Sequence, residues 1–194
     1  AKRYKPTVCG VGYWGCEDVD TDSTAYNKWH GMLHRCYSTK VHEKYPEYIG
    51  CIVSEEWKNF SNFRYWYEKN NYGGSNLNLD KDILYKGNKQ YSPDTCCLVP
   101  GFINTLFTNG KANRGELPLG VYKEEKNGIT CYRACMAVSS KSIKLGTFKT
   151  PEEAFQKYKE YKEQYIKDTA KRYKDKIPYS VYEAMMNWKV EITD

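Results

Sequence analysis

The sequence predicts an α+β protein with two parts, and three observations support this class. The N-terminal half carries aromatic and aliphatic residues at helical spacing, whereas the region from Leu119 onward holds short runs rich in β-forming residues. An Asn-Gly pair joins two of those runs, which is a strong hairpin signal. A stretch rich in Gly, Asn and Lys lies between the two halves. We therefore expect a first domain over residues 1–109, a linker over 110–118 and a second domain over 119–194.

Composition sets broad limits on the function. The 194-residue chain is 40% apolar and 28% charged, which is ordinary for a protein with a buried core. Its net charge of +6 is compatible with a polyanionic partner but does not require one. No run of about 18 apolar residues predicts a membrane span, and no signal peptide is visible, so a cytoplasmic protein is the default expectation. In that setting the eight cysteines favour thiols or metal ligands over disulfides.

Two helices are expected in the first half, after a loop-rich arm over residues 1–22. The first begins at a Ser23 or Thr24 cap and runs to about Tyr37. Residues 38–51 look like a loop, and Ser54 can cap a second helix. Each helix has an inward face at helical spacing: Tyr26, Trp29, Leu33 and Cys36 on the first, and Trp57, Phe60 and Phe63 on the second.

The stretch "LDKDILYKGNKQYSPDTCCLVPGFINTLF", residues 79–107, carries the polar residues of greatest interest. It predicts a strand, a loop, a turn, a second strand and the start of a helix. Asp80 and Asp82 lie at its beginning and Asn104 near its end. Without further information, an exposed hairpin with solvated charges and a helix-capping asparagine would explain these residues.

The last third predicts a three-stranded antiparallel sheet packed on a helix. The strands fall within residues 119–148, and Asn127-Gly128 would form the first turn. Thr150 caps the helix, with Pro151 at its first position and Glu153 completing a capping box. A short final helix is expected from near Pro178. A single helix covers one face of such a sheet and leaves the other face open.

Residues 120–158 resemble the APETALA2/ethylene-response-factor DNA-binding domain. The resemblance rests on Gly120-Val121, "YRA" at 132–134, "LGTF" at 145–148, Thr150 and "EEA" at 152–154. It implies that the sheet binds double-stranded DNA, and this chain's few arginines favour phosphate contacts over base readout. The candidate contact residues are Tyr122, Lys123, Lys126, Tyr132, Arg133, Lys141 and Lys144.

The first half resembles the HNH, or His-Me finger, nucleases, whose core is a ββα-metal unit. Residues 79–81 take the place of the Val-Asp-His strand, residues 87–89 supply the loop, and "CLVP" followed by Asn104 supplies the second strand and the helix. From about Tyr26 to the end, the chain is similar to phage-borne HNH homing endonucleases with an appended APETALA2-type domain. This resemblance implies a phage or mobile-element protein that acts in the cytoplasm of a bacterial host.

The nuclease resemblance implies a specific chemistry. Asp80 and Asn104 map onto two ligands of a Mg²⁺ or Mn²⁺ ion, which suits oxygen ligands. Lys81 stands where the family carries its general-base histidine, and a protonated lysine could only stabilise the developing negative charge. His42 is then a candidate base, and Asp82 a candidate base or second metal ligand on the same strand face as Asp80.

Further metal sites are weaker hypotheses. Cys36, Cys51, Cys96 and Cys97 could hold a structural Zn²⁺, with His42, although no CxxC pair exists and buried free thiols are the alternative. His30 and His34 share one helix face, but no third ligand is evident.

These observations predict a metal-dependent DNA endonuclease that binds duplex DNA through its C-terminal sheet. Two alternatives stay open. One is a DNA-binding regulator on an HNH scaffold that no longer cleaves. The other is a phage effector that binds a host protein through its Tyr- and Trp-rich surface, for which DNA binding would depend little on salt. The oligomeric state and the target sequence are not predicted.

Overall fold

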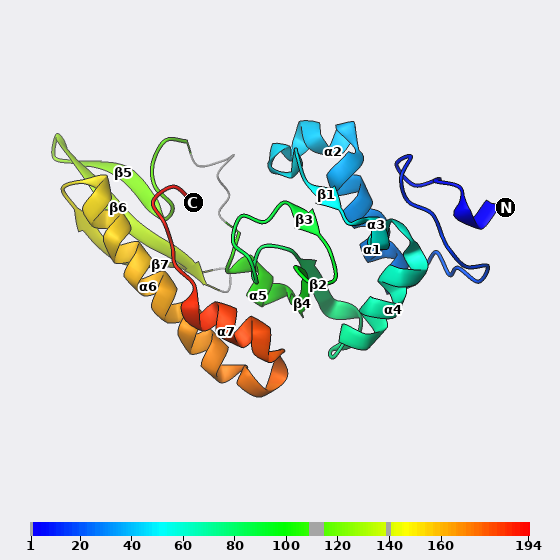
Figure 1. Ribbon diagram of the computed structural model, residues 1–194. Coiled ribbons are helices and arrows are strands. Elements are labelled where there is room, and N and C mark those ends of the chain that lie inside the picture. The colour runs from blue at the N-terminus through cyan, green and yellow to red at the C-terminus, as the bar shows by residue number, and fades with distance from the viewer. Residues whose placement is uncertain (1, 109–114, 139–140) are drawn as a thin grey trace. The chain divides into compact units, whose positions relative to one another are not determined.

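A computed structural model describes residues 2–108, 115–138 and 141–194, and it shows a mixed α+β protein (Figure 1). The chain divides into two compact units, Ala1–Phe107 and Thr108–Asp194, which are described separately. Most of the expected linker, residues 110–114, lies outside the described residues. Within the described part, no helix has both the length and the apolarity to cross a membrane.

The first helix of the first unit, α1, is confirmed at Thr24–Tyr37. It begins where the backbone N–H of Tyr26 donates to Ser23 Oγ at 3.3 Å. Its inner face is fully buried at Trp29 and Leu33. Trp29 Nε1 donates to the carbonyl oxygen of Trp57 at 2.7 Å, so the core also contains a buried hydrogen bond that ties α1 to the next helices.

Two expectations for the next segment are wrong. Residues 38–51 are not one loop, because they form α2 (Thr39–Lys44) and the short 3₁₀ helix η2 (Pro46–Tyr48). The helix after Ser54 is divided into α3 (Glu55–Lys58) and α4 (Phe60–Asn70). Asn59 separates them with an extended backbone, and its side chain caps α4 by accepting from the N–H of Ser61 at 2.9 Å. Ser54 precedes α3 but makes no capping hydrogen bond.

The strands of the first unit form two small sheets. β1 (Ile52–Val53) runs parallel to β3 (Gln90–Tyr91), and β2 (Leu77–Asp80) runs antiparallel to β4 (Cys97–Pro100), which leads directly into α5 (Gly101–Thr105). Single 3₁₀ turns occur at η1 (Lys2–Tyr4) and η3 (Gly74–Asn76). Figure 1 shows α5 against β2 and β4, and both strands contact it.

The register of β2 and β4 decides where Asp80 points. Asp80 lies opposite Cys97 in the ladder. Leu77 and Leu79 pack into the core of the unit. Because side chains alternate along a strand, Asp80 lies on the opposite face of the sheet, together with Cys97.

The second unit contains the predicted three-stranded antiparallel sheet, in the order β5 (Val121–Lys126), β6 (Ile129–Val138) and β7 (Lys141–Phe148). The expected Asn127-Gly128 turn is confirmed, and the positive φ values of the two residues, 52° and 76°, are those of a type I′ turn. α6 (Pro151–Arg172) lies along one face of the sheet (Figure 1). The core between them holds the side chains of Val121, Ala134, Met136, Ala154, Phe155 and Tyr158.

The ends of this unit follow the expected chemistry in part. The expected capping box is only half formed, because Glu153 Oε2 accepts the N–H of Lys149 at 3.2 Å rather than that of Thr150. The N–H of Glu153 donates to Thr150 Oγ1 at 3.2 Å, and Pro151 occupies the first turn of α6. After η5 (Lys174–Lys176), α7 (Tyr179–Asn187) packs on α6 and buries Val181 and Met185.

Candidate functional site

Asp80 ends β2 and turns the chain out of the strand. Its Oδ1 accepts the backbone N–H groups of Asp82 and Ile83, each at 2.7 Å. Burial raises the pKa of this carboxyl above its usual value, and the two N–H groups partly oppose that shift. A carboxylate offers about four lone-pair sites, so two hydrogen bonds leave acceptor capacity on Asp80.

Asn104 lies on α5, the helix that packs against β2 and β4. Its Oδ1 is buried, and no hydrogen-bond donor reaches it among the described residues. Leaving a buried polar atom without a partner costs about 1–3 kcal/mol, so such atoms call for an explanation. An amide oxygen is a ligand that Mg²⁺ and Ca²⁺ accept. The donor set of Asp80 and Asn104 therefore fits a hard divalent cation.

Lys81 is buried and tied down. Its Nζ donates to Asp82 Oδ2 and to the carbonyl oxygen of Asn88, both at 2.6 Å. Asn88 returns a hydrogen bond from Nδ2 to the Lys81 carbonyl at 2.9 Å. These three bonds hold the loop between β2 and β3, and an ammonium that donates in this way cannot accept a proton. A role in stabilising negative charge stays a prediction.

The sequence suggested that Asp82 shares a strand face with Asp80, and this expectation is wrong. β2 ends at Asp80, and Asp82 follows in a bend. Its carboxylate forms the ion pair with Lys81. The structure therefore gives Asp82 a counter-ion role.

The histidines lie on helices. His42 was expected on a loop but belongs to α2, and its Nε2 lies 2.9 Å from the carbonyl oxygen of Arg35, to which it donates. The rings of His30 and His34 have centroids 4.3 Å apart on α1, and burial lowers the pKa of His30. The positions of these three histidines therefore do not identify the base that would activate water beside Asp80.

The predicted zinc ligands are buried thiols. Burial raises the pKa of Cys36 and of Cys96 to about 12, and it also raises the pKa of Cys51 and Cys97. The described residues contain no group of three or more His, Cys, Asp or Glu side chains placed to hold a metal ion. Structural zinc stays a prediction.

The open face of the sheet carries part of the predicted DNA-contacting set. By register and alternation, four of the seven residues point away from α6: Tyr122, Lys126, Arg133 and Lys144. The other three lie on the α6 side: Lys123, Tyr132 and Lys141. Tyr132 packs against the core there, so it is placed for stability rather than for contact with DNA.

Glu124 is a residue of the open face that the sequence analysis missed. Its Oε1 pairs with Arg133 Nη1 at 2.7 Å, and its Oε2 lies 3.9 Å from Lys126 Nζ. The Arg133 guanidinium carbon lies 5.7 Å from the centre of the Tyr122 ring. Glu124 thus orients Arg133 and reduces the positive charge of this face. The Asn127-Gly128 turn fixes the register and could have revealed the pair.

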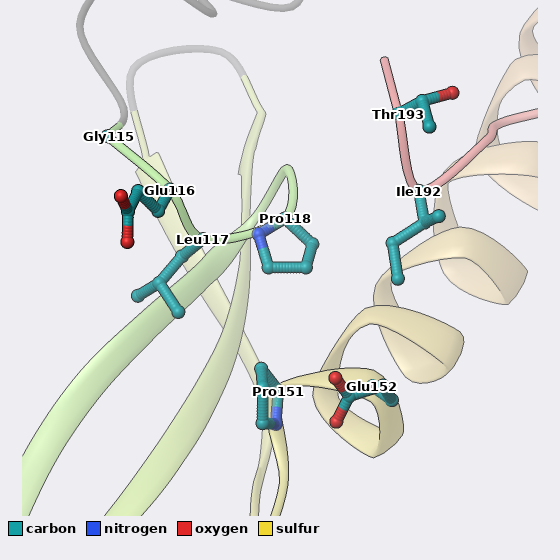
Figure 2. Close-up of a pocket in the computed structure, with 8 residues that line it drawn as sticks. All are labelled: Gly115, Glu116, Leu117, Pro118, Pro151, Glu152, Ile192 and Thr193. Carbon is teal, nitrogen blue, oxygen red and sulfur yellow. The ribbon is translucent and has the colours of Figure 1, made fainter.

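A pocket of about 430 Å³ lies in the second unit (Figure 2). Residues 115–118, the beginning of α6 and Ile192 with Thr193 line it. Its ionisable side chains are the exposed Glu116 and Glu152, and none of the predicted site residues reaches it. An acidic pocket of this kind does not suit a polyanionic ligand.

No family model, curated protein or solved structure matches this chain. The case for a function therefore rests on the residues of the site and on the motifs quoted from the sequence.

Proposed function

We propose that the protein is a metal-dependent DNA endonuclease of the phage or mobile-element type. The observation that carries the proposal is the buried, unpartnered Oδ1 of Asn104, on the helix that packs against the strand of Asp80. A carboxylate and an amide oxygen on a hairpin and its following helix form the arrangement that the resemblance to HNH nucleases implies. In this proposal β2, β4 and α5 are the ββα-metal unit.

Each residue then has a definable task. Asp80 and Asn104 would hold Mg²⁺ or Mn²⁺, which supplies a Lewis acid for the phosphate. The N–H groups of Asp82 and Ile83 orient the Asp80 carboxylate. Lys81 orders the loop beside the site through Asp82 and Asn88. A base other than Lys81 would accept the proton from the attacking water.

The second unit would hold the duplex. Its open face presents Arg133, Lys126 and Lys144, with Tyr122 stacked on Arg133. A small sheet fits the major groove, and arginine and lysine bind phosphates. Because Glu124 pairs with Arg133, the orientation of the guanidinium, and not only its charge, would decide how it contacts DNA.

A non-cleaving DNA-binding regulator is the second candidate. The observation that favours it is the bonding of Lys81, which stands in the family's histidine position, and of His42, a candidate base. Lys81 donates to Asp82 and Asn88, and His42 donates to the Arg35 carbonyl. Neither side chain is free to accept a proton in this arrangement. This candidate predicts DNA binding without cleavage in Mg²⁺ or Mn²⁺.

Nicking of supercoiled plasmid tests the proposal. Wild type is compared with Asp80→Asn, which keeps an oxygen for the two N–H donors, and with Asn104→Leu, which replaces the unpartnered amide by an apolar group. Metal-dependent nicking by wild type that both variants lose supports the endonuclease. Intact plasmid in every case, with DNA binding retained in a gel shift, would support the regulator instead.

A further inference from the structure

One face of α1 carries positive charge, and no acidic side chain among the described residues pairs with it. Lys28, Gly31 and Arg35 are three and four residues apart, so they line one side of the helix. Within the described residues, neither Lys28 nor Arg35 has a carboxylate at ion-pair distance. Fully buried charges in proteins are almost always paired, and burying part of a charged group without a partner also carries a cost, so these two partly buried cations lack a counter-charge.

Aromatic contacts hold the Arg35 guanidinium in place. Its Nε donates to Tyr91 Oη at 3.1 Å, and its central carbon lies 5.5 Å from the Tyr91 ring and 5.8 Å from the Tyr48 ring. Burial raises the pKa of both tyrosines, so they stay neutral and cannot balance the arginine. The guanidinium has five N–H donors, and the bond to Tyr91 uses one.

Gly31 leaves the approach to this guanidinium open. A Cβ at position 31 would lie 3.5 Å from Arg35 Nη1, in van der Waals contact, so a side chain there would occupy space beside this nitrogen. Glycine is unfavourable in the middle of a helix, and here no positive φ requires it. Lys28 lies one turn before Gly31, and burial and then the nearby Arg35 lower its pKa. A bound anion would relieve this repulsion between the two cations.

We propose that Lys28, Gly31 and Arg35 form a binding site for a phosphodiester group of the DNA backbone. The inference rests on the proposed function, because it assigns a substrate contact to the unit that carries Asp80. The two regions are linked through Tyr91, whose ring lies 5.9 Å from Lys81 Nζ, and Lys81 follows Asp80 in the chain. Arginine binds phosphate with its planar fork, and lysine adds a point charge.

The test places a carboxylate of the protein itself beside Arg35, where it would compete with a bound phosphate. In Gly31→Glu, the new carboxylate lies four residues before Arg35, the favourable order for an ion pair along a helix. Gly31→Gln has nearly the same size without the charge. Both replace a helical glycine, so neither is expected to unfold α1. Affinity for a labelled DNA duplex is measured by fluorescence anisotropy over a range of KCl concentrations in EDTA, where metal-dependent cleavage cannot occur.

If the site binds a phosphate, Gly31→Glu binds more weakly than Gly31→Gln, and the slope of log K against log salt falls by about 0.9 for each phosphate that the protein no longer neutralises. Lys28→Gln should lower the slope similarly, whereas Lys69→Gln on the exposed end of α4 should not. A matched pair at the exposed Tyr65, Tyr65→Glu and Tyr65→Gln, measures the effect of one added charge elsewhere in the unit. Equal differences at positions 31 and 65 would overturn the inference.

Two further experiments distinguish DNA from free phosphate as the ligand, and DNA binding from DNA cleavage. Potassium phosphate is compared with KCl at equal ionic strength in thermal melting. Protection by inorganic phosphate, with DNA affinity unchanged in both Gly31 variants, would overturn the assignment to DNA. A reduced slope in Gly31→Glu with no plasmid nicking by wild type would support this site and contradict the endonuclease, so the two proposals fail separately.

Discussion

The ion pair between Lys81 and Asp82 gives a quantitative prediction about how the buried Lys81 ammonium is held. Asp82→Ala removes the carboxylate and leaves the Lys81 ammonium buried with the Asn88 carbonyl. Breaking a fully buried pair from one side costs about 3–5 kcal/mol. The Asp82 side chain is 39% exposed, so water replaces part of the missing interaction, and we expect the variant to be less stable by about 2 kcal/mol.

A second substitution should recover part of that stability. Lys81→Met removes the buried charge and keeps most of the volume, so the orphaned Asn88 carbonyl is the main remaining cost, about 1 kcal/mol. The double variant Lys81→Met/Asp82→Ala should therefore be more stable than Asp82→Ala. The order of stability, rather than either value alone, shows that the buried Lys81 charge depends on Asp82 as its partner.

Urea unfolding followed by tryptophan fluorescence measures these differences, because Trp29 and Trp57 are fully buried in the same unit as Lys81. Two results would refute the reasoning. One is an Asp82→Ala variant within about 0.5 kcal/mol of wild type, the range of an ordinary surface substitution. The other is a double variant less stable than Asp82→Ala.

Three further predictions concern Asp80, Lys162 and Gly120. The raised pKa of Asp80 means that protonation stabilises the folded state, and this stability is lost as the pH rises through the folded pKa. Asp80→Asn should therefore gain stability relative to wild type as the pH rises above about 4, and a series of thermal melts at increasing pH checks it. Lys162 is buried on α6, and burial lowers its pKa to about 8 from 10.5, so keeping it charged at pH 7 costs free energy of folding. Lys162→Met should therefore stabilise the second unit by up to about 3 kcal/mol at pH 7 and by less at pH 10. Unfolding measurements that show no gain at pH 7 would contradict this. Gly120 has a φ of +76°, and a Cβ there would lie 2.1 Å from the Tyr158 ring. Gly120→Ala should therefore lower the free energy of unfolding by several times the roughly 1 kcal/mol of an ordinary glycine replacement. A melting temperature close to that of wild type would refute this prediction.

The sequence predicted elements whose signals are local. The Ser23 and Thr150 caps and the Asn127-Gly128 turn each depend on a few neighbouring residues, and the structure confirms all three. The division between α3 and α4 was missed because Trp57, Phe60 and Phe63 keep a helical spacing across Asn59. Its extended backbone also pairs with Tyr13, a contact distant in sequence.

The candidate site was only partly predictable, because part of it depends on contacts between residues that are distant in the sequence. The residues Asp80 and Asn104 were found by a resemblance, but the unpartnered state of Asn104 Oδ1 depends on how α5 packs. The contact of Arg35 with Tyr91 joins residues 56 apart in the chain, and no local pattern indicates it. His42 was placed on a loop because residues 38–51 contain Pro46 and Gly50, whereas the structure has a helix there.

The most direct test of the central claim is the binding of Mn²⁺ itself, measured by titration with electron paramagnetic resonance. We predict one site in wild type that is absent in Asp80→Asn and in Asn104→Leu, with both variants folded as judged by circular dichroism. Equal Mn²⁺ binding by all three proteins would contradict the assignment of Asp80 and Asn104 as metal ligands, and with it the proposed endonuclease site.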